Sequence, residues 1–112
     1  MKNYVQAGDV VTLSAPRDVV SGELVAVGRV VGVAQAGAKS GEPVALVRRG
    51  VFSDLAKKSG QSWSVGDVLY YDATAKKLTN VEAETVFAVG AAMAQAESAA
   101  TVGTVLLDGA VR

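Results

Sequence analysis

The 112-residue chain contains no cysteine, no histidine and only two prolines. Without thiols and imidazoles it cannot form disulfides or a Ser-His triad, and it lacks the ligands of almost every transition-metal site. Carboxylate and lysine groups are the remaining candidates for chemistry. We therefore predict a protein that is not an enzyme and that holds no metal and no cofactor.

Large aromatic side chains are also scarce. Hydrophobic residues make up 50% of the chain but aromatic residues only 5%, so the apolar content is mostly valine and alanine. The length suits one domain with its own core. A core of small side chains is thin, and small apolar residues left outside form patches that a monomer rarely exposes. We therefore expect the protein to associate with copies of itself.

An excess of charge is absent as well, because 11 basic and 11 acidic residues cancel. A protein that grips nucleic acid electrostatically carries a basic excess, so we expect no direct nucleic-acid partner. The longest apolar runs are broken by Arg29 or too short to span a bilayer, and the N-terminus lacks a signal-peptide core. We expect no membrane contact and synthesis in the cytoplasm.

Short apolar strands dominate the local pattern. Gly-Asp turns introduce Asp9–Ser14 and Asp67–Asp72, turn residues follow, and long valine-rich stretches come next. Glycines within those stretches predict bulges or sharp bends. Helical signal is limited to Ser53–Gly60, where Ser53 could cap a short helix, while Ala92–Ala100 is expected to be a loop. The predicted fold class is mainly β, a small β-barrel or β-sandwich with at most one short helix, and α+β is the second choice.

A weak internal repeat underlies this layout. Gly8-Asp9-Val10 recurs as Gly66-Asp67-Val68, and Val31-Gly32 recurs as Val89-Gly90, both at an offset of 58 residues. The repeat predicts two similar β units, about 5–51 and 63–111, that share one core in a single domain spanning 1–112. Residues 1–8 precede the first core strand and are a candidate N-terminal arm.

Two features invite a chemical interpretation. Asp9 and Asp67 could act as an acid and base pair, but an aspartate after glycine at a strand entry is ordinary turn chemistry, which we favour. The segment Gly32–Pro43 nearly matches a phosphate-binding loop, except that Ala38 separates the second glycine from Lys39. The residues that follow read as a strand rather than the helix such a loop requires. We predict a solvated turn there.

Arg48, Arg49 and Trp63 are candidate contact residues. The two arginines could bind an anionic group, but adjacent strand residues point to opposite faces, so we expect them to act separately and one to pair with an acid. Residues 1–58 carry a net charge of +3 and residues 59–112 carry −3. This split suggests that Arg48 or Arg49 of one subunit meets an acid of its neighbour, such as Glu82, Glu84 or Asp108. Trp63 either covers the end of the core or anchors an interface.

The order of these features resembles the DUF2190 family of phage proteins across essentially the whole chain. The resemblance rests on the following residues: Asn3-Tyr4-Val5-Gln6, Gly8-Asp9, Ser21-Gly22, Val27-Gly28, Gly50-Val51-Phe52, Trp63, Gly66-Asp67, Tyr70, Asp72, Lys77-Leu78-Thr79, Gly90 and Leu107. It implies a small β-rich capsid decoration protein that sits as a trimer on the outside of an icosahedral shell. Some members are labelled as RecA/RadA-like recombinases, which the broken loop around Lys39 does not support.

The resemblance and the missing catalytic inventory together predict a structural protein of a phage or prophage head, located in the virion on the capsid exterior. Its partners are itself and the major capsid protein. Asn3, Tyr4, Val5 and Gln6 are the candidate shell contacts, because they precede the first strand and could add to a neighbouring sheet edge. The alternatives are a nucleotide-dependent recombination factor, or a binding module of another phage structure such as the tail.

Overall fold

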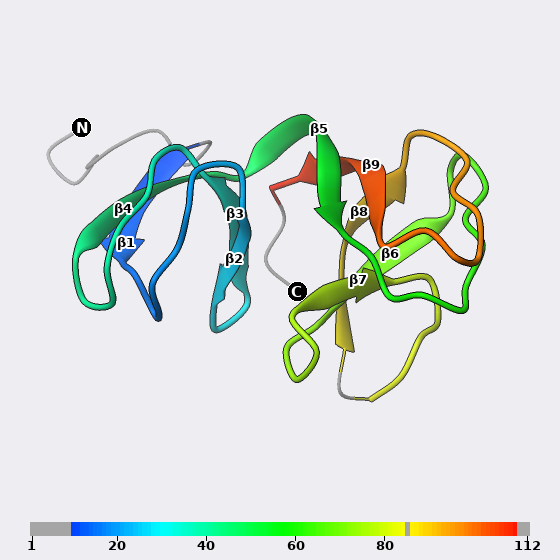
Figure 1. Ribbon diagram of the computed structural model, residues 1–112, viewed down its shortest axis with the longest axis horizontal. Coiled ribbons are helices and arrows are strands. Elements are labelled where there is room, and N and C mark those ends of the chain that lie inside the picture. The colour runs from blue at the N-terminus through cyan, green and yellow to red at the C-terminus, as the bar shows by residue number, and fades with distance from the viewer. Residues whose placement is uncertain (1–9, 85, 110–112) are drawn as a thin grey trace, which may run out of the picture.

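The structure is a computed structural model that describes residues 10–84 and 86–109. Within them the chain forms nine strands and no helix (Figure 1). The strands are β1 (Val10–Ser14), β2 (Leu24–Val27), β3 (Val30–Ala34), β4 (Pro43–Val47), β5 (Arg49–Ala56), β6 (Val68–Asp72), β7 (Lys77–Thr79), β8 (Val86–Ala92) and β9 (Val102–Asp108). The prediction of a mainly β fold is confirmed. The two sheets are open, so the sandwich alternative holds and the closed barrel does not.

Both sheets are antiparallel and share a strand order. The first is ordered β1-β4-β3-β2 and the second β5-β9-β8-β6-β7. The two orders correspond when β5, β6, β8 and β9 are matched to β1, β2, β3 and β4, and β7 is then an additional strand at one edge. An equivalent pair of backbone hydrogen bonds lies beside each sheet. Val19 and Ala38 exchange a pair of N–H···O bonds beside the first sheet, and Trp63 and Ala96 exchange the same pair beside the second. In Figure 1 the two sheets lie side by side and β5 leads from one to the other.

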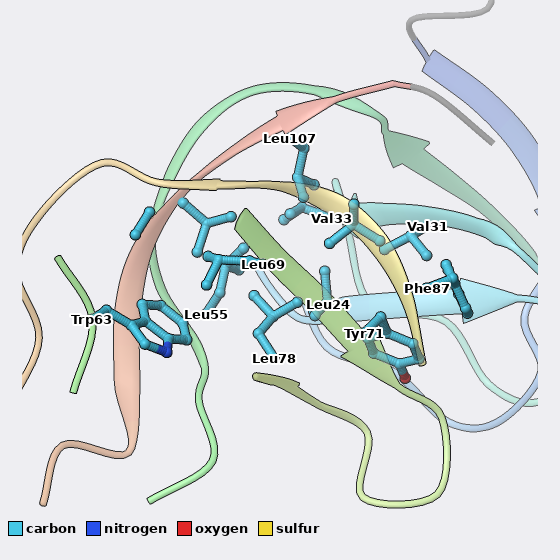
Figure 2. Packing of buried hydrophobic residues seen from close by; sticks show 13 residues of the cluster. Leu24, Val31, Val33, Leu55, Trp63, Leu69, Tyr71, Leu78, Phe87 and Leu107 are labelled. Atoms are coloured by element: carbon cyan, nitrogen blue, oxygen red, sulfur yellow. The ribbon is translucent and has the colours of Figure 1, made fainter. Parts of the chain in front are cut away.

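The main core lies between the sheets. Its members come from the inner face of the second sheet, from its loops and from one face of β2 and β3 (Figure 2). They are Leu24, Val31, Val33, Leu55, Trp63, Leu69, Tyr71, Leu78, Phe87, Val89, Ala92, Val105 and Leu107. A smaller cluster covers the opposite face of the first sheet: Ala15, Val19, Val25, Ala34, Val44 and Leu46. Because β2 and β3 are covered on both faces, they read as continuous apolar runs.

The predicted short helix at Ser53–Gly60 is wrong. Residues 49–56 form β5, which pairs with β9 through a bulge between Phe52 and Leu55. At the bulge Asp54 adopts a φ of 59°. Pairing with β9 buries Leu55 in the main core. The free energy of this pairing and burial exceeds the local preference for a capped helical turn. The predicted loop at Ala92–Ala100 is confirmed after Ala92, the last residue of β8.

Of the glycines predicted to mark bends, Gly28 and Gly90 lie at a turn and at a register shift, whereas Gly32 lies within the regular strand β3. Gly28 has a φ of 60° in the two-residue turn between β2 and β3, the position that a type II′ hairpin reserves for glycine. Gly90 lies beside a register shift between β6 and β8. A Cβ atom on Gly90 would stand 1.8 Å from the carbonyl oxygen of Leu106, so β8 and β9 can approach only at a residue without a side chain.

Replacing Gly90 with alanine should therefore destabilise the protein strongly. Forcing extra atoms into a packed site costs about 1–3 kcal/mol or more, and each kcal/mol lowers Tm by roughly 4–8 °C in a domain of this size. Thermal unfolding followed by Trp63 fluorescence would measure the change.

Gly37→Ala is the matched control, because its added Cβ would meet no atom closer than 3.4 Å. We expect Gly37→Ala to shift Tm by only a few degrees. Equal Tm values for the two variants would contradict the proposed close approach.

Candidate functional site

The segment that resembles a phosphate-binding loop is already occupied by the chain's own carboxylates. The Lys39 amide donates to Glu42 Oε1 at 2.7 Å, and the Ser40 amide donates to Asp18 Oδ1 at 2.8 Å. Strand β4 follows directly, as predicted, and no helix opens there. Backbone amides that would bind phosphate in such a loop are thus paired internally, which supports the predicted turn.

Within the described residues, three turns are closed by a carboxylate in the same way. In Val20–Glu23, Lys39–Glu42 and Ser64–Asp67, the fourth residue's amide donates to the first residue's carbonyl, and its carboxylate accepts from the first residue's amide. The third residue is a glycine with a φ of 86°, 86° or 91°, as in a type II turn. The predicted turn role of Asp67 is confirmed, whereas Asp9 lies outside the described residues.

Two carboxylates have lowered pKa values. Asp72 Oδ2 accepts from Lys58 Nζ at 3.0 Å, and Oδ1 accepts from the Ala75 and Thr74 amides, so these bonds hold the pKa of Asp72 below its ordinary value. Burial alone would raise the pKa of Glu23. Hydrogen bonds from the Val20 amide and from Arg17, whose Nη1 lies 2.7 Å from Glu23 Oε2, outweigh it and lower that pKa.

Acid should therefore destabilise the fold through these groups. A carboxylate whose pKa is lower in the folded state contributes stability above its unfolded pKa, about 4, and loses it as the pH falls through the folded value. Asp72→Asn should lower Tm near pH 7, and the difference in Tm between parent and variant should shrink as the pH falls below about 4. Thermal unfolding from pH 7 to pH 3 would measure this.

Glu97→Gln serves as the control, because Glu97 is exposed in the loop after β8. It should leave the pH profile of the parent unchanged. A constant gap between Asp72→Asn and the parent at every pH would show that Asp72 stabilises the fold only as a hydrogen-bonding group and not through its charge.

The structure brings Arg48 and Arg49 to the same residue, Gly109. Arg48 Nη2 donates to the Gly109 carbonyl, and the aliphatic stem of Arg49 occupies the space where a Cβ atom on Gly109 would stand. Arg49 is also the cross-strand partner of Asp108 in the β5–β9 ladder. Asp108 lies opposite Arg49 in its own chain, and its predicted contact with an arginine of a neighbouring subunit stays a prediction. Opposite charges in such a pair contribute about 0.2–1 kcal/mol.

Trp63 belongs to the main core and is 1% exposed. Its ring packs on Gly103, where an added Cβ would lie 2.4 Å from the ring, and Lys57 Nζ lies 5.5 Å from the ring centroid. Lys57 is fully buried, and its ammonium donates to the carbonyls of Lys58 and Ala100. Within the single chain the Trp63 side chain therefore lies in the core, which agrees with the first of its two predicted roles.

The outward face of the second sheet carries a continuous apolar row. Cross-strand pairing sets Val51 beside Leu106, Leu106 beside Ala91, and Ala91 beside Val68, across β5, β9, β8 and β6. Directly paired residues share a face, so these four residues, which we call the outer row, form one strip. Val51, Leu106 and Val68 are 55%, 36% and 51% exposed. Sequence analysis missed this row.

A signal for the outer row exists in the sequence. Three apolar residues in succession, Val105, Leu106 and Leu107, cannot all face one side of a strand, so one of them must lie on the opposite face. The cross-strand register that joins Leu106 to Val51 and Ala91 depends on pairings between distant segments, which the local pattern does not contain.

Some of the predicted contact residues fall outside the part of the chain that the structure describes. Asn3, Tyr4, Val5 and Gln6 lie outside the described residues. Within residues 10–84 and 86–109, no group of three acidic, histidine or cysteine side chains is arranged to hold a metal ion. In that same part of the chain there is no helix long and apolar enough to cross a membrane.

A comparison with known protein families identifies the family of this chain. The family model described as phage cement protein matches residues 5–107. The chain therefore belongs to the phage cement protein family. Its role is structural: it stabilises the phage capsid, as a component of the virion that binds the capsid shell. The searches of curated proteins and of solved structures returned no match.

Proposed function

We propose that the protein is a non-enzymatic cement subunit that binds the outside of the phage head as a homotrimer, with the major capsid protein as its partner. The match of residues 5–107 to the phage cement family carries the proposal. The trimer and the exterior position come from the resemblance to capsid decoration proteins. No feature of the described residues favours the nucleotide-dependent alternative, since the amides of Lys39 and Ser40 are occupied.

The mechanism follows from linkage. A protein that binds the assembled shell, and not its separated subunits, stabilises the assembled state by the free energy of its binding. This requires a rigid body that keeps its contact surfaces in fixed positions. The carboxylate-held turns and the core between the sheets supply such a body here.

Residues 3–6 are the proposed shell contact. They lead into β1, which forms an edge of the first sheet and pairs with β4 on one side. An edge strand can accept another strand, so we propose that residues 3–6, which precede β1 in the sequence, pair with a strand of the shell protein. β1 carries neither proline nor a charged residue, the two common devices that block such pairing.

Removing residues 2–8 should abolish binding to the shell without unfolding the protein. The measurement is electron microscopy of purified heads lacking the protein, incubated with the parent or with the truncated variant, with a thermal melt of each protein as the folding control. Density on the heads with the parent and none with the variant is the expected result. Equal density with both would exclude the arm as the main contact, and no density with the parent would overturn the cement proposal itself.

Self-association can be measured on the isolated protein. Light scattering at high concentration should give a mass three times that of the 11.4 kDa chain. A mass of one chain at every concentration would contradict a trimer in solution. A mass of two chains would show that the protein self-associates with a different symmetry.

A further inference from the structure

We propose that the outer row, Val51, Leu106, Ala91 and Val68, is the surface through which one copy of this chain packs on another. The inference rests on the proposed self-association and adds the face that carries it. The cross-strand register places the four residues in one strip over four strands.

The two faces of the second sheet differ in what covers them. Along β9, Val105 and Leu107 are buried in the main core, whereas Leu106 between them points to the other side. The first sheet contributes Leu24, Val31 and Val33 to the covered face. On the outer face the row stays accessible, with Val51 and Val68 at its two ends more than half exposed, and contiguous exposed apolar side chains are a feature of association surfaces.

The shape of the outer face suits sheet-on-sheet packing. A hollow of about 250 Å³ lies beside Leu106, and its floor is formed by small residues, Ala88, Gly90 and Ala91. An apolar side chain of a second copy would fill it as two sheet faces approach to about 10 Å.

Charge at the border of the row selects a second copy over a partner of one charge sign. Asp108 lines the hollow, and its cross-strand partner Arg49 lies next to it on β5. A uniformly acidic or basic partner would oppose one of these two charges. Other copies of this chain offer both signs, and in a trimer each copy can set its Arg49 near Asp108 of one neighbour and its Asp108 near Arg49 of the other. The chain has no net charge, so copies do not repel one another at neutral pH.

The test is Leu106→Asp, which places a charge in the middle of the outer row. Val20→Asp is the matched control, because Val20 is 66% exposed at a turn of the first sheet and lies outside the row. Sedimentation equilibrium over a range of concentrations should show that the parent and Val20→Asp associate alike. Leu106→Asp should associate at least tenfold more weakly.

A milder variant keeps the proposal testable if Leu106→Asp does not fold. The chain has no cysteine, so Val51→Cys introduces a unique thiol in the row, and Val20→Cys does so outside it. The reaction rate of Val51→Cys with a soluble disulfide reagent should fall severalfold as the protein associates. The rate of Val20→Cys should stay constant.

The possible failures separate the two proposals. If the parent associates but Leu106→Asp associates as tightly, or the Val51→Cys thiol stays reactive in the oligomer, the row is not the interface and self-association stands. If the parent is monomeric at every concentration, self-association in solution fails and this inference fails with it. Protection of Val51→Cys only on phage heads would assign the row to the shell and overturn its assignment to a second copy.

Discussion

The structure depends on the core that joins the two sheets. On one face of the first sheet, the side chains of Leu24, Val31 and Val33 pack against the inner face of the second sheet. Val25 and Ala34 of the same strands face the other way. Separating the sheets would expose Leu24, Val31 and Val33, and the inner face of the second sheet, to water at a cost of about 25 cal/mol for each Å² of apolar surface. The two sheets therefore stabilise each other.

The same core explains why an apolar face remains outside. A sheet has two faces, and one neighbouring sheet with its loops covers one of them. The chain has few large aromatic side chains, so Trp63, Tyr71 and Phe87 are used on the inner face, where they fill the space between the sheets. The outer row is left with Val51, Leu106, Ala91 and Val68, which are small enough to form a flat contact surface. A cement protein acts by binding other proteins, and an exposed apolar surface of this kind suits binding.

Local sequence predicted most of the strands, because alternation and turn residues are short-range signals. It placed Asp67 in a turn and left residues 93–100 without a helix, and both predictions hold. It failed at Ser53–Gly60, where capping chemistry suggested a helix. The decisive interactions there are long-range: Leu55 pairs with Gly103, and the ammonium of Lys57 reaches the carbonyl of Ala100.

By itself the sequence determined the fold class and the absence of thiol and imidazole chemistry, since both follow from composition and local periodicity. It also indicated the phage family through the order of its short motifs. Only the tertiary structure decided which residues meet across strands: that Trp63 lies in the core, that Arg49 stands opposite Asp108 in its own chain, and that Leu106 joins an exposed apolar row. These outcomes depend on strand register, and register is set by pairing between segments far apart in the chain rather than by any one segment.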